Sequence, residues 1–394
     1  RSNADRWSDY AGDRKYFVWL FCIENERLYV MKKREYFSHF IFKGSHFEVG
    51  IQHGEAFRED IRNHMNMILE LAAGNSGLSR EAVLKLVDGY EPFIAKYTPG
   101  FIEELKGLSQ GAGIEYREAL LLQMKQEIVY AARFGNAEPS DPACTSFAFN
   151  SSYTCDGKVY SGQNTDQDGE FRNVGNIVTF AVTGKPRVMM LVPAGQISFM
   201  GMNELGMSTA CNFLPCTGWK PGFPRYLLSR YMLEQTSFEQ ACLNLRGIDS
   251  IASSRNILLA DGEGHMVNYE ILPVGVGEIH GNGSLIHTNH FVHPEMAKYE
   301  KSNPYELEDS LVRYQRLTEL GEDNKGNIEL SMIQSFLRDH GDHPCYSICM
   351  HPSLRNTYRT MASLVFDLTD RVMYVAAGNP CQSQYHKYTF EMQP

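Results

Sequence analysis

The spacing of apolar side chains changes near residue 143. Before that point, apolar residues recur every three to four positions from Ile51 to Leu71, which predicts an amphipathic helix. Ser79 is a suitable N-cap for another helix, and similar repeats cover residues 101–111 and 117–134. The segment up to about residue 134 is therefore predicted to be mainly helical.

After residue 143 the sequence consists of short aromatic or β-branched segments separated by Gly and Asn turns, which is typical of strands. Strands are expected at residues 145–149, 158–162, 177–182, 187–192, 197–201, 256–260, 265–271 and 284–288, with a last hairpin at 361–367 and 372–376. Helices are expected at residues 224–235, 237–246, 308–320 and 328–338. Strands, then helices, then strands again favour two sheets with helices on their outer faces.

The same patterns divide the chain into three segments. Residues 1–43 are expected to be an N-terminal extension, residues 44–143 a mainly helical segment and residues 144–394 a strand-rich segment. A linker rich in Pro, Ser and Asp, residues 135–143, separates the last two. We expect these two to pack as one unit, because the amphipathic helices have no other core to bury against.

Charge and composition narrow the choice of partner. The chain has 394 residues and a formal net charge of −10. This balance argues against nucleic acid, because such binding relies on clustered Lys and Arg. No stretch approaches the roughly 18–20 apolar residues of a membrane-spanning helix, so a membrane is not an expected partner either. A small neutral or cationic molecule is the expected partner, and assembly into a homo-oligomer is left open.

Nine cysteines are scattered between Cys22 and Cys381, without the dense, even spacing of a disulfide scaffold. This usage favours a reducing compartment, and we expect a cytoplasmic protein. The tripeptide Ser2–Ala4 is compatible with an expression-tag remnant. A signal peptide removed ahead of it is therefore the alternative.

Candidate chemistry begins at the junction of the two large segments. Cys144 follows the linker directly and stands at the start of a predicted strand. Taken alone, it is more simply a small buried apolar residue. Four other segments of the sequence change that interpretation. Three lie downstream, Gly-Gln-Asn-Thr-Asp at 162–166, Ile-His-Thr-Asn-His at 286–290 and Asp-Ser-Leu-Val-Arg-Tyr at 309–314, and one lies upstream, Gly-Ser-His-Phe-Glu-Val-Gly at 44–50.

Together, these segments resemble the acyl-CoA:6-aminopenicillanic acid acyltransferase family, the C45 group of the N-terminal-nucleophile (Ntn) hydrolases. The family is related to the penicillin V acylases and the bile salt hydrolases. The resemblance covers roughly Phe42 to Phe390, and it rests on the order and spacing of the segments. It implies an α+β fold, the four-layer αββα sandwich with two mainly antiparallel sheets.

The resemblance also implies a precursor that cleaves its own Ala143–Cys144 peptide bond. A thiol with a pKa near 8.5 needs a base, and the freed α-amino group, with a pKa of about 7.7–8.0, lies on the same residue. The implied activity is hydrolysis of a linear C–N amide, or acyl transfer from an amide or thioester, through an acyl-Cys144 intermediate. The fragment that ends at Ala143 is expected to stay bound as a partner of the strand-rich, catalytic segment.

Further roles come from the same resemblance. Asp166 would hold the Cys144 amine, and Asn289 would donate its amide to the oxyanion of the tetrahedral intermediate. The plainer alternatives are a turn Asp and a strand-end Asn. The resemblance implies an arginine near the site without fixing whether it is Arg313 or Arg359. Three more residues are candidates for a supporting role, Thr145, Ser146 and Asn164.

Two other classes of protein compete with this hypothesis. A metal-dependent hydrolase would use the set His280, His287, His290 and His293, or the pairs Cys345 and Cys349 or Cys211 and Cys216. None of these has the spacing of a common zinc motif, so no metal, nucleotide or flavin cofactor is expected. A non-catalytic binding protein with the same fold is disfavoured by the presence of Cys144, Asp166 and Asn289.

The substrate cannot be read from the sequence. Four aromatic residues in loops could line an acyl pocket or pack the core, namely Phe171, Phe199, Phe213 and Trp219.

Overall fold

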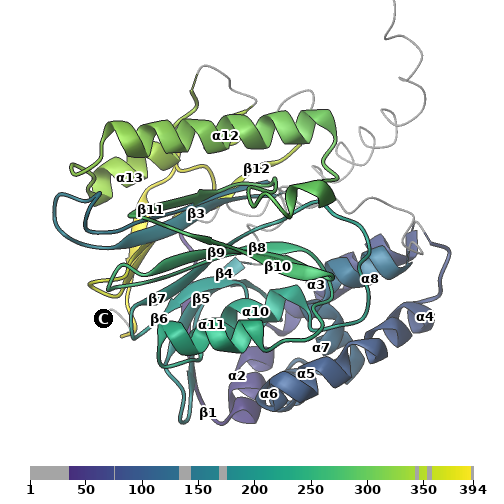
Figure 1. Ribbon diagram of the computed structural model, residues 1–394. Helices are drawn as coiled ribbons and strands as arrows, with labels where there is room; N and C mark the ends of the chain where they lie inside the picture. The colour runs from purple at the N-terminus through teal and green to yellow at the C-terminus, as the bar shows by residue number, and fades with distance from the viewer. Residues whose placement is uncertain are drawn as a thin grey trace, which may run out of the picture. The chain divides into compact units, whose positions relative to one another are not determined.

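The computed structural model describes residues 35–74, 76–132, 143–167, 175–341, 346–352 and 357–391. The first 34 residues of the expected N-terminal extension and most of the expected linker lie outside this described part. From Glu35 onward the chain forms one unit. Two sheets stack face to face, with helices on both outer sides, as Figure 1 shows. The predicted four-layer αββα class is confirmed.

One sheet has eight strands, and all but one of its neighbouring pairs are antiparallel. In spatial order they are β1 (His39–Gly44), β4 (Gly175–Val182), β5 (Val188–Pro193), β6 (Met200–Asn203), β7 (Met207–Asn212), β8 (Arg255–Asp261), β9 (Met266–Leu272) and β10 (Gly275–His280). The exception is the parallel pair of β1 and β4. Most of β1 falls within the expected extension, yet it forms an edge of this sheet.

The other sheet has six strands, all antiparallel to their neighbours. In spatial order they are β11 (Ser284–His287), β2 (Cys144–Phe149), β3 (Tyr160–Gln167), β12 (Arg359–Asp367), β13 (Val372–Ala377) and β14 (Tyr385–Tyr388). Cys144, the first residue of β2, lies opposite Thr165 of β3. The junction of the two large segments is therefore at the end of an inner strand.

The helices form two outer layers. The eight-stranded sheet is covered by α2 (His46–Ala56), α3 (Arg58–Gly74), α4 (Arg80–Lys85), α5 (Glu91–Tyr97), α6 (Pro99–Ala112), α7 (Tyr116–Gln123), α8 (Lys125–Ala132), α10 (Leu228–Leu233) and α11 (Phe238–Arg246). The six-stranded sheet is covered by α12 (Pro304–Asp323) and α13 (Leu330–Leu337). Both α2 and α12 begin at a capping box, formed by Ser45 with Glu48 and by Asn303 with Glu306.

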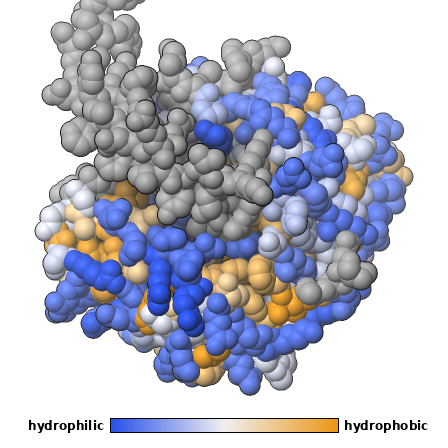
Figure 2. Space-filling view, turned by 180° about the vertical axis from the view of Figure 1, so that it is seen from behind, coloured by the Kyte–Doolittle hydropathy of each residue, from blue (hydrophilic) through white to orange (hydrophobic). Residues whose placement is uncertain are grey.

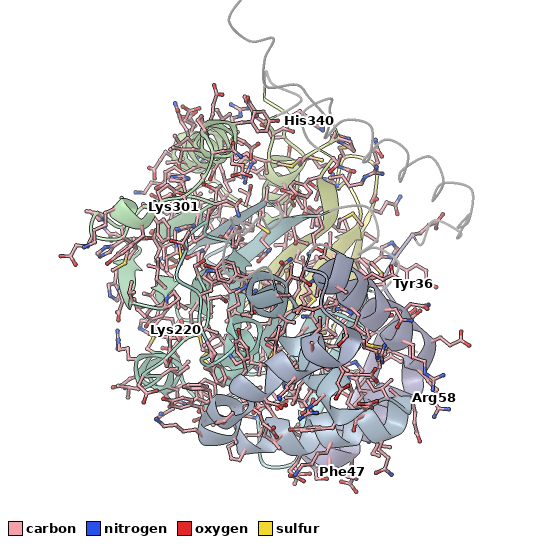
Figure 3. All side chains as sticks on the ribbon, turned by 90° about the vertical axis from the view of Figure 1, so that its right-hand side faces the viewer. Tyr36, Phe47, Arg58, Lys220, Lys301 and His340 are labelled. Atoms are coloured by element: carbon pink, nitrogen blue, oxygen red, sulfur yellow. The ribbon has the colours of Figure 1, made fainter. Side chains whose placement is uncertain are left out.

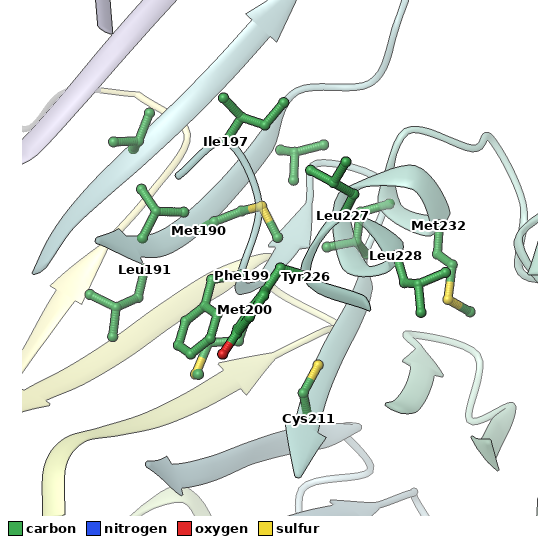
Figure 4. Packing of buried hydrophobic residues seen from close by; sticks show 14 of the residues in the cluster. Met190, Leu191, Ile197, Phe199, Met200, Cys211, Tyr226, Leu227, Leu228 and Met232 are labelled. Atoms are coloured by element: carbon green, nitrogen blue, oxygen red, sulfur yellow. The ribbon is translucent and has the colours of Figure 1, made fainter. Parts of the chain in front are cut away.

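The helical segment is joined to the strand-rich segment in three ways. It supplies β1 to the larger sheet. Its buried Glu104 on α6 forms a two-bond ion pair with the buried Arg230 of α10, at 2.5 and 2.8 Å. Its apolar side chains share one core with those of the larger sheet, part of which is drawn in Figure 4, where Phe199, Cys211 and Tyr226 lie among Met and Leu side chains.

Helices α2 and α6 pack with their backbones in close approach. A Cβ atom added at Gly107 would lie 2.1 Å from the carbonyl oxygen of Phe47, and one at Gly50 would lie 2.0 Å from that of Glu104. Glycine is therefore required at both positions, since any larger residue would force the helices apart.

On the face shown in Figure 2, hydrophobic side chains are interspersed among hydrophilic ones. Among the described residues, no helix combines the length and apolar composition needed to span a bilayer.

Candidate active site

Cys144 is buried, with 8% of its surface exposed, at the first position of β2. Its backbone N–H donates to Asn289 Oδ1 at 2.8 Å, and its thiol lies 3.7 Å from Thr165 Oγ1. Its carbonyl oxygen accepts from Asn212 Nδ2 at 3.0 Å and from Arg313 Nη1 at 2.7 Å. Both peptide groups of this residue are thus fixed by side chains from other elements.

Of the two candidate arginines, Arg313 is the one that contacts Cys144. It is fully buried on α12, where the ion pair with Asp309, one turn earlier, fixes its guanidinium at 2.7 Å. Nη1 also donates to Thr145 Oγ1 at 2.9 Å, and Nη2 donates to Asn289 Oδ1 at 3.1 Å. One side chain therefore links β2, the segment after β11 and α12. Arg359, the other candidate, is exposed at the start of β12.

Asp166 is buried on β3, beside the linker end of Cys144. Its backbone N–H donates to the carbonyl oxygen of Ala143 at 2.9 Å, so it binds the very peptide group that precedes Cys144. Its Oδ1 accepts from Thr360 Oγ1 at 2.6 Å. Its other carboxylate oxygen, Oδ2, is buried without a hydrogen-bond partner among the described residues. Such an orphan acceptor is costly, and it is one that an amine could satisfy.

Burial determines the ionisation of both residues. Burial raises the pKa of Asp166 to about 7, although Arg313 and the Thr360 hydroxyl oppose the rise. Burial, and then the charge of Asp166, raises the pKa of the Cys144 thiol to about 12. In the uncut chain, the thiol is therefore protonated at neutral pH, and it needs a base before it can act as a nucleophile.

Asn289 follows β11, and both its backbone and its side chain form hydrogen bonds. Its backbone N–H donates to Ser310 Oγ at 2.7 Å, and its Nδ2 donates to the carbonyl oxygen of Phe213 at 3.0 Å. Its Oδ1 accepts from the Cys144 N–H in the uncut chain. An amide nitrogen carries two N–H groups, and the described residues provide an acceptor for one of them.

The other predicted supporting residues divide between the two faces of the smaller sheet. Thr145 contacts Arg313 on the helical side, and Asn164 donates there to the carbonyl oxygens of Leu337 and Ile348, both at 2.8 Å. Ser146 faces the other sheet and donates to Asn212 Oδ1 at 2.6 Å. Asn164 therefore fixes the segment after α13, whereas Thr145 and Ser146 fix the start of β2.

Three contributors were missed by the sequence reasoning: Asn212, Asp309 and Thr360. Asn212 ends β7, and its side chain binds Cys144 across the gap between the sheets. Asp309 lies in the Asp-Ser-Leu-Val-Arg-Tyr segment already singled out, and its i, i+4 spacing to Arg313 could have indicated an ion pair. Thr360 carries no sequence signal, because only strand pairing brings it opposite Asp166.

The aromatic candidates fall in different places. Phe199 packs in the core of the larger sheet, and Phe171 lies outside the described residues. Phe213 and Trp219 pack edge to face, with ring centroids 6.1 Å apart, and the Phe213 carbonyl binds Asn289. Trp219 also lines a cavity of about 290 Å³ with Tyr90, Tyr130 and Pro221. These two residues are the aromatic candidates next to the site.

The histidines considered as metal ligands have other partners. His287 Nε2 lies 2.9 Å from Glu270 Oε1, and His290 Nδ1 lies 2.8 Å from Ser310 Oγ. His280 contacts Glu278. No potential metal-ligand group within the described residues contains these histidines. Cys211 contacts Ser229 in the core, and Cys345 lies outside the described residues.

A four-layer sandwich with a nucleophilic residue type at the first position of an inner strand is the fold of the Ntn hydrolases. The family model for acyl-coenzyme A:6-aminopenicillanic acid acyl-transferase matches residues 154–382, and the chain belongs to this family.

Two curated proteins illustrate the relationship. The acyl-coenzyme A:6-aminopenicillanic-acid-acyltransferase 40 kDa form of Emericella nidulans is 26% identical over 345 residues, covering 87% of this chain and 93% of that protein. The beta-alanyl-dopamine/carcinine hydrolase of Drosophila melanogaster is 22% identical over 383 residues, with the same two coverages.

The chain is also similar to two solved structures. A variant of the conjugated bile acid hydrolase from Clostridium perfringens is 14% identical, with a TM-score of 0.47, covering 63% of this chain and 97% of that one. The penicillin V acylase from Agrobacterium tumefaciens is 14% identical, with a TM-score of 0.40, covering 59% of this chain and 83% of that one.

Proposed function

We propose that this protein is a self-processing amidohydrolase or acyltransferase whose nucleophile is an N-terminal Cys144. Its substrate would be a small molecule with a linear C–N amide, or an acyl thioester. The observation that carries the proposal is the orphan Oδ2 of Asp166, a buried carboxylate oxygen beside the peptide that joins Ala143 to Cys144. Cleavage of that peptide would create the ammonium group that this oxygen lacks.

Self-cleavage would begin in the uncut chain. Asp166, with a pKa of about 7, takes the Cys144 thiol proton directly or through one water, and the sulfur attacks the Ala143 carbonyl carbon. The Asp166 backbone N–H already donates to that carbonyl oxygen at 2.9 Å, so it would stabilise the oxyanion. Collapse breaks the C–N bond and gives a thioester, while the proton passes to the new amine. Water then hydrolyses the thioester to a free Ala143 carboxylate and the Cys144 thiol.

The amine released in this step would be the base of the mature enzyme. An α-amino group has a pKa near 7.7–8.0, whereas the buried thiol is protonated at neutral pH. The amine accepts the thiol proton, and the Asp166 carboxylate pairs with the ammonium that results. This pairing would lower the pKa of Asp166 relative to the uncut chain, because an adjacent cation favours the carboxylate.

Turnover would then follow an acyl-enzyme route. The Cys144 thiolate attacks the acyl carbon, and the second N–H of Asn289 Nδ2 donates to the oxyanion. The leaving amine or thiol takes a proton from the ammonium, and an acyl thioester remains on Cys144. Water completes hydrolysis, or a second amine completes acyl transfer. The names of the two curated relatives, one a transferase and one a hydrolase, agree with either acceptor.

The fragment that ends at Ala143 would remain in place after cleavage. It contributes β1, which forms a six-residue pairing with β4, and Glu104, which neutralises the buried Arg230. Loss of the fragment would remove both bonds to Glu104 and leave that guanidinium with the single carboxylate contact to Glu234 Oε1, at 3.0 Å. Processed protein should therefore elute as one species in native gel filtration and give two chains only after denaturation.

The proposal is tested by trapping the acyl-enzyme. Purified protein is mixed with short-chain and medium-chain acyl thioesters, quenched in acid and mapped by mass spectrometry. The expected adduct lies on Cys144, is absent from Cys144→Ala and persists in Cys155→Ser, which removes an exposed thiol elsewhere. An adduct of equal yield in Cys144→Ala would contradict the proposal.

A further inference from the structure

Four side chains with metal-binding atoms converge outside the active site: His340, Cys349, His351 and Cys381. Their ligand atoms all lie within 4.8 Å of one another, and they form the only such group of three or more in the described part of the chain. His340, labelled in Figure 3, follows α13 beside the C-terminal strands. Cys349 and His351 lie just before β12, and Cys381 follows β13.

The individual distances define a compact shell. The two Nε2 atoms of His340 and His351 are 3.0 Å apart, and the two Sγ atoms of Cys349 and Cys381 are 3.5 Å apart. His351 Nε2 lies 3.3 Å from Cys381 Sγ and 3.7 Å from Cys349 Sγ. Each side chain thus places one ligand atom within 4.8 Å of the other three.

These distances are those of the edges of a coordination tetrahedron. Zinc bonds of about 2.3 Å to sulfur and 2.0–2.1 Å to nitrogen give edges of about 3.8 Å between two sulfurs, 3.6 Å between sulfur and nitrogen, and 3.3 Å between two nitrogens. The four separations given above, which are four of the six edges, each fall within about 0.3 Å of the expected value. We propose that His340, Cys349, His351 and Cys381 form a Cys2His2 site for a structural zinc ion.

The chemistry of the ligands favours zinc, because a tetrahedral set of two sulfur and two nitrogen ligands is typical of that ion. Four protein ligands leave no open position for water, as in structural rather than catalytic sites. Outer-shell support is present as well, since Asn379 Nδ2 donates to Cys349 Sγ at 3.6 Å and to the Met350 carbonyl oxygen at 2.6 Å. Cys349 is buried and Cys381 is exposed, so an ion could enter from the solvent side.

The proposed zinc would fix a segment that supports the active site. Met350 lies between the ligands Cys349 and His351, and its backbone exchanges two hydrogen bonds with Thr360, at 2.9 and 3.0 Å. Thr360 in turn donates to Asp166. The cluster also joins the segment after α13 to the segment after β13. The inference does not depend on the proposed catalytic role of Cys144.

The competing explanation is a disulfide between Cys349 and Cys381. Their sulfur atoms are 3.5 Å apart, well beyond the 2.03–2.05 Å of a bond. A disulfide would also leave unexplained why His351 Nε2 lies within 3.7 Å of both sulfurs and within 3.0 Å of His340 Nε2. The two hypotheses differ in a measurable way, because a disulfide consumes both thiols and excludes zinc.

The test is metal content, measured on the full chain purified with a phosphine reductant. Wild-type protein is equilibrated with excess Zn²⁺, gel-filtered and analysed by inductively coupled plasma mass spectrometry. We expect about one zinc per chain, together with the intense visible absorption of tetrahedral Co²⁺ and a thiolate charge-transfer band after cobalt exchange.

Substitutions test which residues bind the zinc ion. Cys381→Ser, at an exposed ligand, should weaken zinc binding by at least the about 10–100-fold that loss of an outer-shell partner causes, and Asn379→Ala should fall within that range. Cys155→Ser, at an exposed cysteine outside the cluster, should bind like wild type. The cobalt spectrum of wild type is independent of how any variant folds. Wild-type protein without zinc, a Cys349–Cys381 disulfide in the reduced preparation, or equal zinc in Cys381→Ser and Cys155→Ser would each overturn the proposal.

Discussion

Replacing Asp166 by Asn should make the uncut chain more stable at alkaline pH while it abolishes self-cleavage. The carboxylate is buried, one of its oxygens has no partner among the described residues, and its pKa is raised from 3.8 to about 7. A raised pKa means that the folded state holds its proton between about pH 4 and 7, where the unfolded state has released it. Stability is therefore lost as the pH rises through that window.

The magnitude follows from the shift. About three pKa units correspond to about 4 kcal/mol of destabilisation above pH 7, and to about 1.6 kcal/mol at pH 5, where the folded carboxyl is still protonated. Asn avoids this penalty, although its new N–H groups cost about 1–3 kcal/mol if they lack acceptors. That cost is independent of pH. The advantage of Asp166→Asn should therefore grow by about 2–3 kcal/mol between pH 5 and pH 8.

The assay compares thermal unfolding of Cys144→Ala with that of Cys144→Ala/Asp166→Asn, because the first substitution keeps both chains uncut. For the roughly 330 residues that the structure describes, 1 kcal/mol moves Tm by about 1.4 °C, so the difference in Tm between the pair should widen by about 3–4 °C from pH 5 to pH 8. Asp323→Asn, at an exposed carboxylate, is the control and should show no widening. An unchanged difference at the two pH values would refute the reasoning about Asp166.

Three further predictions concern named contacts. Thr360→Val removes the hydroxyl that lowers the pKa of Asp166, so the midpoint of self-cleavage, expected near pH 7, should move to higher pH in a pH series followed by gel electrophoresis. An unchanged midpoint would show that the ionisation of Asp166 does not control self-cleavage. Arg313→Lys loses the bonds to Cys144 and Asn289, so self-cleavage should slow by about 10²-fold. The control Arg359→Lys, at an exposed residue, should be processed at the wild-type rate. Equal rates for the two variants would contradict a role for Arg313 beside Cys144. Gly107→Ala should lower the free energy of unfolding, measured by urea titration, by about 1–3 kcal/mol or more. Gly74→Ala, which has open space at its Cβ position, should leave that free energy unchanged. Similar free energies of unfolding for the two variants would contradict the close packing of α2 and α6.

Sequence periodicity predicted the regular parts of the fold well. The repeat at 101–111 became α6, and the segments at 177–182 and 187–192 became β4 and β5, because their apolar positions bury against one core. The edge strand β11 was predicted at 284–288, but the edge strands β1, β10 and β14 and the inner strand β7 were missed. The strands β1 and β10 each pair on one side only, and β10 has two glycines and exposed positions, so neither carries the alternation of a half-buried strand.

Only part of the candidate site could be predicted from the sequence. The segments that contain Cys144, Asp166 and Asn289 could be picked out, but only the α12 helix shows why Arg313 rather than Arg359 lies beside Cys144. The Cys2His2 cluster was missed because its ligands come from three separated parts of the chain. The spacing of nine residues from His340 to Cys349, and of thirty from His351 to Cys381, matches no common zinc motif.

The most direct test of the central claim is the intact mass of the denatured protein, for wild type and for Cys144→Ala. The account predicts two wild-type chains, one ending at Ala143 and one beginning with a free amine at Cys144, and a single 44.8 kDa chain for the variant. A wild-type chain that stays intact after prolonged incubation at pH 8, or a variant that is cleaved at the same bond, would contradict it.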